Sequence, residues 1–195
     1  MNKELIIFDF DFTIAKTEEH IWVWSPRGVL RHNNNKLYHR LHPTELQQSG
    51  VADDEIIDDI SFTEFYNLNI DKAQIINPIF PYIKYYTSVS EIYILTARPP
   101  AVKKDVLNFL LKNSIDINKI NFIGLKNSCF HKKIEWIKNK IRNSDYTKII
   151  LFEDNKKLID YLLNNNINNM SFDLYYIIAN HHNIIITYHE KTKSD

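Results

Sequence analysis

The chain has little glycine and almost no cysteine, and both shortages narrow what it can be. Its three glycines, Gly28, Gly50 and Gly124, are too far apart to build a glycine-rich dinucleotide loop or a Walker-type nucleotide loop. Its one cysteine, Cys129, cannot form a disulfide within the chain, which is typical of proteins from reducing compartments. The lack of these loops therefore excludes the usual classes of kinase and Rossmann oxidoreductase.

An excess of charge and a long apolar run are also missing. Lys and Arg number 24, as do Asp and Glu, so the whole chain is not the basic body expected of a dedicated nucleic-acid binder. The first apolar run is too short for a signal peptide, and no run reaches membrane-spanning length. We therefore expect a soluble, cytoplasmic protein without a membrane partner. The sequence does not indicate its oligomeric state.

What the chain does have is an alternation of short apolar runs with amphipathic segments. Its 195 residues suffice for about one domain with a proper core. The alternation predicts an α/β fold, a Rossmann-like parallel sheet with helices on both faces. After the first run at 5–8, the expected strands are 91–95, 120–125 and 148–152, each followed by a helix, and the segments LYYIIA and IIITY predict one or two closing strands.

Residues 15–70 break this rhythm and predict an insertion after the first strand. Two short apolar stretches flank the turn SPRG, which predicts a β-hairpin, and LHPTELQQSG predicts the start of a short helix. We therefore expect a core of residues 1–14 and 71–195 that carries a small cap, built from a hairpin and a short helical segment.

The first candidate site lies in LIIFDFDFTI, residues 5–14. In a strand, alternate side chains share a face, so Asp9 and Asp11 point the same way. Two like charges after a buried strand need a cation or a shared proton to offset their repulsion. The alternative is a loop in which the two aspartates only cap the next helix.

Three further polar clusters follow apolar segments later in the chain. Thr96 and Arg98 follow the strand at 91–95, Lys133 begins a helix, and Glu153 and Asp154 follow the strand at 148–152. The carboxyl ends of parallel strands meet at one edge of the sheet, where ligands collect. Two structural alternatives stay open, because Lys133 and Glu153 also suit a plain ion pair, and Thr96 also suits a helix cap.

In their order and placement, these clusters resemble the signatures of the haloacid dehalogenase (HAD) superfamily. The matching pieces are IIFDFDFTI, IYILTARPP, Lys133 and IILFEDN. Over residues 5–165 the chain also resembles small HAD-type proteins of phages and large DNA viruses, which share stretches corresponding to HIWV, LHPTEL, FTEF with INP, LTARPP and KIEWI. For a viral chain the location would be the host cytoplasm.

The resemblance implies roles for the catalytic residues. Asp9 is expected to be the nucleophile that forms an aspartyl-phosphate, and Asp11 the general acid and base. Thr96 would donate its hydroxyl to a phosphate oxygen, and Lys133 would neutralise the transferring phosphoryl group. Lys132 stands next to Lys133, but the apolar residues three, four and eight positions later favour Lys133 by register.

The resemblance also implies Mg²⁺ as the cofactor. The expected protein ligands are Asp9, the backbone carbonyl of Asp11, and Asp154. Glu153 is the less defined member, expected to orient Lys133 rather than to face the ion. Because the pair reads Glu-Asp where relatives have two aspartates, this division of roles stays open.

The candidate substrate contacts are arginines. Arg98 suits a phosphate contact or a surface salt bridge equally. In the insertion, Arg27, Arg31 and Arg40 lie in an acid-free basic stretch that suits an anionic substrate. The same stretch also suits a solvated face that is balanced by DDEIIDD nearby.

Together these features predict a Mg²⁺-dependent phosphohydrolase that acts on a phosphomonoester. The favoured substrates are a phosphorylated small molecule such as a nucleotide, or a nucleic-acid end such as a polynucleotide 3′-phosphate. Two alternatives remain: a catalytically idle HAD scaffold that serves as a nucleic-acid or protein adaptor, and a phosphotransferase that uses the same nucleophile.

Overall fold

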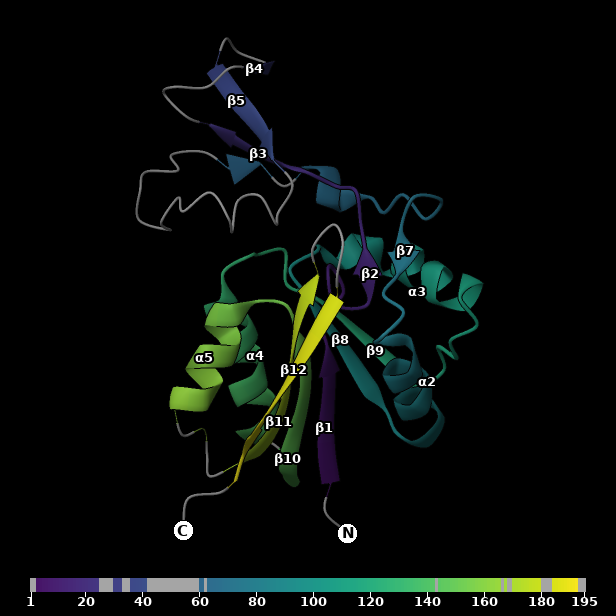
Figure 1. The fold of residues 1–195 in the computed structure, drawn as a ribbon, viewed down its shortest axis with the longest axis vertical. Helices are drawn as coiled ribbons and strands as arrows, with labels where there is room; N and C mark the ends of the chain where they lie inside the picture. The colour runs from purple at the N-terminus through teal and green to yellow at the C-terminus, as the bar shows by residue number, and fades with distance from the viewer. Residues whose placement is uncertain are drawn as a thin grey trace.

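A computed structural model of the chain describes residues 3–24, 30–32, 36–41, 60–61, 63–142, 144–165, 167, 170–179 and 184–192. Within these residues, six strands form one sheet in the order β12-β11-β10-β1-β8-β9 (Figure 1). All neighbouring strands are parallel except β11 and β12. The strands are β1 (Lys3–Phe8), β8 (Ile92–Thr96), β9 (Ile120–Gly124), β10 (Tyr146–Glu153), β11 (Ser171–Ala179) and β12 (Ile184–Lys191).

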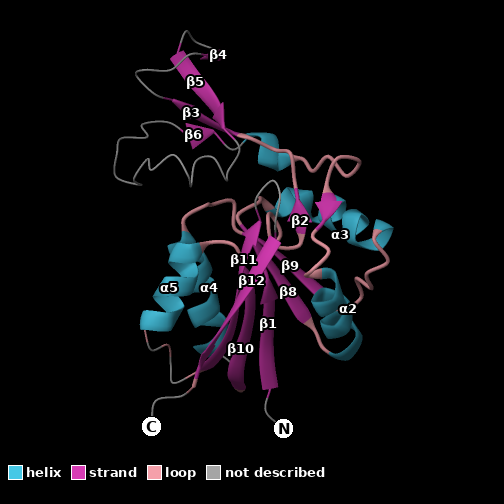
Figure 2. Ribbon diagram, in the orientation of Figure 1, coloured by secondary structure: helices cyan, strands magenta, loops and turns pink. Residues whose placement is uncertain are grey.

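Strand β1 lies inside the sheet because its apolar residues fill both faces. Ile6 and Phe8 belong to one buried cluster, and Leu5 and Ile7 belong to the other. The first face is covered by α2 (Phe80–Val89) and α3 (Lys103–Lys112), and the second by α4 (Phe130–Arg142) and α5 (Lys156–Asn164) (Figure 2). The result is a three-layered, Rossmann-like α/β arrangement, as the alternating pattern predicts.

The strand order reverses next to β1. After β1 the chain builds β8 and then β9 on one side, and it crosses to the other side for β10 and β11. In parallel α/β sheets such a reversal opens a crevice at the carboxyl ends of the strands, and this is where ligands bind. In this chain the reversal lies between β1 and β10.

Between β1 and α2 the chain builds two smaller sheets. It leaves the core through β2 (Ala15–Lys16) and returns through β7 (Gln74–Ile75), and these two strands pair with each other. A four-stranded sheet has the order β4-β5-β3-β6, with β3 (Ile21–Trp24), β4 (Leu30–His32), β5 (Lys36–Leu41) and β6 (Ile60–Ser61). Figure 1 shows this sheet beyond the carboxyl end of β1.

The hairpin predicted around SPRG is wrong. Its two apolar stretches form β3 and β4, but these strands do not pair with each other, because β5 lies between them and bonds to both. The short helix predicted for LHPTELQQSG falls outside the described residues after Leu41. The predicted boundaries between the core and the cap stay predictions. The identification of this insertion as a cap stays a prediction too.

The two closing segments form β11 and β12, and β12 runs antiparallel because the short connection between them leaves no room for a crossover.

The one short helical element in the described part of the insertion is η1 (Thr63–Tyr66), a 3₁₀ helix. None of the described helices is long and apolar enough to span a bilayer.

Candidate active site at the ends of β1 and β10

A tight turn after β1 fixes the positions of the first two aspartates. The amides of Ile14 and Ala15 both donate to the carbonyl of Phe10. Phe12 takes up a positive φ of 56°, a left-handed conformation that bulky residues rarely adopt. The turn leaves Asp9 buried and Asp11 partly buried. A strained backbone at the end of a central strand is a common feature of functional sites.

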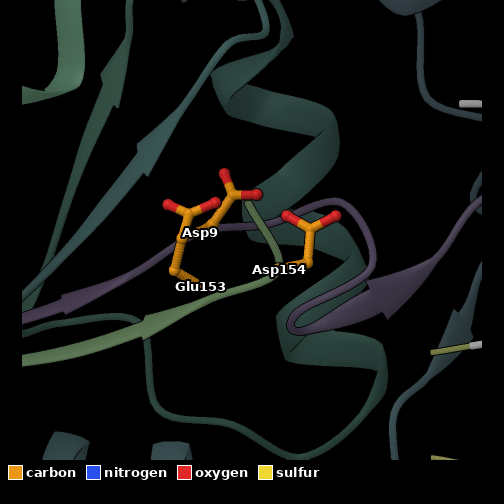
Figure 3. Close-up of side chains that lie close together, drawn as sticks. All are labelled: Asp9, Glu153 and Asp154. Atoms are coloured by element: carbon orange, nitrogen blue, oxygen red, sulfur yellow. The ribbon is translucent and has the colours of Figure 1, made fainter. Parts of the chain in front are cut away.

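Three carboxylates meet where β1 and β10 end, and we call them the acidic cluster: Asp9, Glu153 and Asp154. Each offers an oxygen that lies within 4.8 Å of the others (Figure 3). Asp9 directly follows β1, and its amide donates to the carbonyl of Phe152 in β10 at 2.9 Å. The parallel pairing of the two strands therefore brings together carboxylates that lie far apart in the sequence.

Lys133 is the cation that reaches the acidic cluster. Its Nζ lies 2.8 Å from Oε2 of Glu153 and 2.9 Å from Oδ1 of Asp9, and its side chain is only 9% exposed. The neighbouring Lys132 faces solvent and pairs with Glu135 at 3.0 Å on the surface of α4. The predicted pairing of Glu153 with a lysine is therefore present, and it involves Lys133.

The acidic cluster is not electrically balanced by the described residues around it. Three carboxylates face one ammonium group, which leaves two negative charges when all are ionised. Burial, with help from Glu153 and Asp11, raises the pKa of Asp9 to about 7 despite the opposing effect of Lys133. Burial and the charges of Asp9 and Glu153 likewise raise the pKa of Asp154 well above its usual value.

Lys133 keeps its charge in this setting. Burial opposes the ammonium form, but the charges of Asp9 and Glu153 outweigh burial and raise the pKa of Lys133 above its ordinary value. Lys133 does not satisfy Asp9 fully, because Oδ1 of Asp9 is buried without a hydrogen-bond donor although Nζ is close to it. A buried carboxylate oxygen without a donor leaves room for one more positively charged partner.

The acidic cluster fits a divalent cation that prefers oxygen ligands. Carboxylate oxygens with waters are the donor set that Mg²⁺ uses, and the uncompensated negative charge of the cluster favours such an ion. Of the described residues, Asp9, Asp154 and Glu153 could hold it. The side-chain oxygens of Asp11 accept hydrogen bonds from Arg98, and the assignment of its backbone carbonyl to a metal stays a prediction.

Thr96 ends the neighbouring strand β8 and is fully buried. The register that pairs Phe8 with Ile94 puts Thr96 at the same edge of the sheet as Asp9. Its Oγ1 accepts a hydrogen bond from the amide of Arg98 at 3.2 Å, and the helical turn that begins at Pro100 has no side-chain cap. Thr96 is thus part of the turn after β8 rather than a helix cap.

Arg98 lies in the interior of the protein and not on its surface. Its side chain is 0% exposed, so the expectation of a surface salt bridge is wrong. Nε donates to Asp11 Oδ2 at 2.9 Å, and Nη2 donates to Asp11 Oδ1 at 2.8 Å and to Glu19 Oε2 at 3.1 Å. Nη1 donates to the carbonyls of Phe65 and Asn67 at 3.4 and 3.0 Å.

We use the term Arg98 network for Arg98 and its four partners, Asp11, Glu19, Phe65 and Asn67. A guanidinium group has five N–H donors, and here each has an acceptor in the protein, so none is left for a substrate in this conformation. Glu19 has no signal in the sequence, because it is one acid of a pair in TEEH. The carbonyls of Phe65 and Asn67 could not be predicted at all, because every residue carries one.

The basic residues of the insertion add nothing to the described site. Arg27 lies outside the described residues. Arg31 is in β4 and Arg40 is in β5, but only their backbones are described. Their proposed contact with an anionic substrate therefore stays a prediction.

Comparisons of the chain with protein-family models, with curated proteins and with solved structures found no match.

Proposed function

We propose that the chain is a Mg²⁺-dependent phosphohydrolase of the HAD type that cleaves phosphomonoesters through an aspartyl-phosphate. The observation that carries this proposal is the acidic cluster: Asp9 lies at the strand-order reversal, in contact with Lys133 and within 4.8 Å of the carboxylates of Glu153 and Asp154. A nucleophile needs a cationic surrounding to approach a phosphate dianion, and Lys133 and a metal ion would provide it.

In the first step an oxygen of Asp9 attacks phosphorus, and the bond between phosphorus and the leaving oxygen breaks. Asp11 gives its proton to that oxygen. In the second step a water attacks the aspartyl-phosphate, Asp11 takes the proton of the water, and inorganic phosphate leaves while the carboxylate of Asp9 is restored. A bound Mg²⁺ ion would neutralise charge on the phosphoryl group and on Asp9.

The remaining residues hold these groups in place. Glu153 bonds to the ammonium of Lys133 with both oxygens, at 2.8 and 3.1 Å, which fixes the lysine beside Asp9. Asp154 follows Glu153 and would supply a carboxylate to a bound metal ion. Thr96 would offer its hydroxyl proton to a phosphate oxygen, since its Oγ1 acts as an acceptor in the turn.

The favoured substrates are nucleotides and polynucleotide 3′-phosphate ends, in the class of phosphorylated small molecules and nucleic-acid ends. The small insertion beyond the end of β1 supports this choice, because it carries the basic stretch with Arg27, Arg31 and Arg40. An anionic substrate that is larger than its phosphate would benefit from such positive charge.

The test is turnover of a panel of phosphomonoesters that includes deoxynucleotides and 3′-phosphorylated oligonucleotides, with and without Mg²⁺. We expect release of phosphate that depends on the metal and falls on the order of 10³-fold or more in Asp9→Asn. Release that is equal in Asp9→Asn would mean that another group is the nucleophile. Absence of metal-dependent turnover across the panel would favour the adaptor, and transfer of phosphate to an added alcohol would favour the phosphotransferase.

A further inference from the structure

The Arg98 network joins Arg98 to three short segments that lie more than 30 residues before it in the sequence. Asp11 belongs to the turn after β1, Glu19 to the segment that leaves the core, and Phe65 and Asn67 to the segment that returns to it. One buried guanidinium contacts them all. The ring of Phe65 lies against the guanidinium, with its centroid 5.0 Å from Cζ. The position of the Asp11 carboxylate and the positions of both insertion stems are thus set by the same group.

The contact between Arg98 and Asp11 fixes a carboxylate plane. Two parallel N–H donors, Nε and Nη2, meet the two oxygens of Asp11 at 2.9 and 2.8 Å. Such a paired contact fixes orientation as well as distance, which a single lysine ammonium cannot do. Thr17 adds a third constraint, because its Oγ1 donates to Oδ1 of Asp11 at 2.8 Å.

The same contacts leave one oxygen of Asp11 better placed for proton exchange than the other. Oδ1 accepts from Nη2 of Arg98 and from Thr17, and Nε of Arg98 lies 3.2 Å away. Oδ2 accepts from Nε alone among the described residues. A carboxylate oxygen has about two lone-pair directions, so Oδ2 keeps one open. The side chain of Asp11 is 14% exposed, so it is not fully enclosed by the described residues.

We infer that Arg98 is a positioning residue that acts through Asp11: it orients the carboxylate so that Oδ2 exchanges the proton with the leaving group, and it ties that orientation to both stems of the insertion. This inference rests on the proposed function. It replaces the expectation that Arg98 binds substrate, because every N–H of the guanidinium already has an acceptor within the protein.

The test compares Arg98→Lys with wild type on two substrates that differ in their need for an acid. The first is the phosphomonoester of the panel with an alkyl leaving group that turns over fastest, and the second is 4-nitrophenyl phosphate, whose leaving group departs without a proton. The quantity is kcat/KM, because it covers the steps up to departure of the leaving group. We expect a loss on the order of 10-fold or more for the alkyl ester and a clearly smaller loss for the aryl ester.

Two further variants separate positioning from folding. Glu19→Gln keeps an acceptor beside Arg98 and removes one charge, so we expect the same preference for the aryl ester with a smaller loss. In an Asp11→Asn background, Arg98→Lys should have no further effect on kcat/KM for the alkyl ester, because the group through which it acts is gone. Arg142→Lys, on the exposed surface of α4, is the matched control and should behave as wild type.

Each outcome decides the matter. Equal losses on both substrates, or an additive loss in the Asp11→Asn background, would assign Arg98 a structural role and overturn the inference. A raised KM with unchanged kcat on both substrates would make it a substrate-binding residue and overturn the inference as well. These results presuppose wild-type turnover. Its absence would instead overturn the proposed function, and the inference would fall with it.

Discussion

Two buried charge clusters lie at the same edge of the sheet, and they are built in opposite ways. The acidic cluster, with Lys133, has more negative than positive charge and an oxygen of Asp9 without a donor. In the Arg98 network, every N–H of the guanidinium has an acceptor. Buried polar groups are normally satisfied. The difference supports the proposal that the first cluster binds a ligand, whereas the second holds parts of the protein together.

The largest effect on stability should come from removing the cation of the acidic cluster. Lys133→Met leaves buried carboxylates facing one another without a partner, and breaking a buried ion pair in this way costs about 3–5 kcal/mol. Urea unfolding of the metal-free protein measures the free energy of unfolding. Lys132→Met is the matched control, because its ammonium is exposed and paired only on the surface, and its effect should stay within about 0.5 kcal/mol. Similar losses for the two variants would contradict the contrast.

A smaller loss is expected when the Arg98 network loses one acceptor. Glu19→Ala leaves an N–H of Arg98 and the amide of Asn69 without their partner, at a cost of about 1–3 kcal/mol. Glu18→Ala is the control, because its side chain is 58% exposed and pairs with Lys72 at 3.3 Å. Urea unfolding of both variants measures the change in the free energy of unfolding. If Glu19→Ala were as stable as Glu18→Ala, the network would not be the saturated structure that the contrast requires.

The gentlest perturbation is pH, because it removes no atom. The pKa of Asp9 lies at about 7 in the folded, metal-free protein against an ordinary value of 3.8, so the folded state binds more protons between these values. The stability of the metal-free protein should therefore fall as pH rises through this window. Thermal unfolding at about pH 5 and about pH 8 measures the effect.

Metal and a variant provide the controls for the pH experiment. Added Mg²⁺ should raise the melting temperature more at the higher pH, where Asp9 is ionised and binds the cation better. In Asp9→Asn the part of the pH dependence that comes from this residue should vanish. A metal-free protein that becomes more stable with rising pH over the same window would contradict the shift assigned to Asp9.

Much of the fold could be predicted because it depends on local patterns. The apolar run of β1 indicated a strand buried on both faces, and the alternation of strands and helices indicated a parallel sheet, to which the structure adds one antiparallel pair, β11 and β12. Lys133 was favoured over Lys132 because the apolar residues three, four and eight positions after it match the helix pattern of the family that the chain resembles. Asp9 and Asp154 could be paired in advance because parallel strands end at one edge.

The parts that could not be predicted depend on pairing over long distances. The two apolar stretches around SPRG look like a hairpin, yet β5 separates them, because strand pairing is decided by which edges are free in the folded sheet. Besides Asp11, the partners of Arg98 are a carboxylate from one stem and two carbonyls from the other. Backbone carbonyls carry no residue signature, so the burial of Arg98 becomes visible only in three dimensions.

The pairing of β2 with β7 gives the insertion a closed base. Ala15 lies opposite Ile75, and beyond the base the amide of His20 still reaches the carboxylate of Glu64 at 3.0 Å. A chain whose two ends meet so closely can be exchanged for another without stretching the scaffold below it. The small sheet beyond His20 could therefore be replaced by another recognition element. The pair of β2 and β7 and the side chain of Arg98 would stay in place.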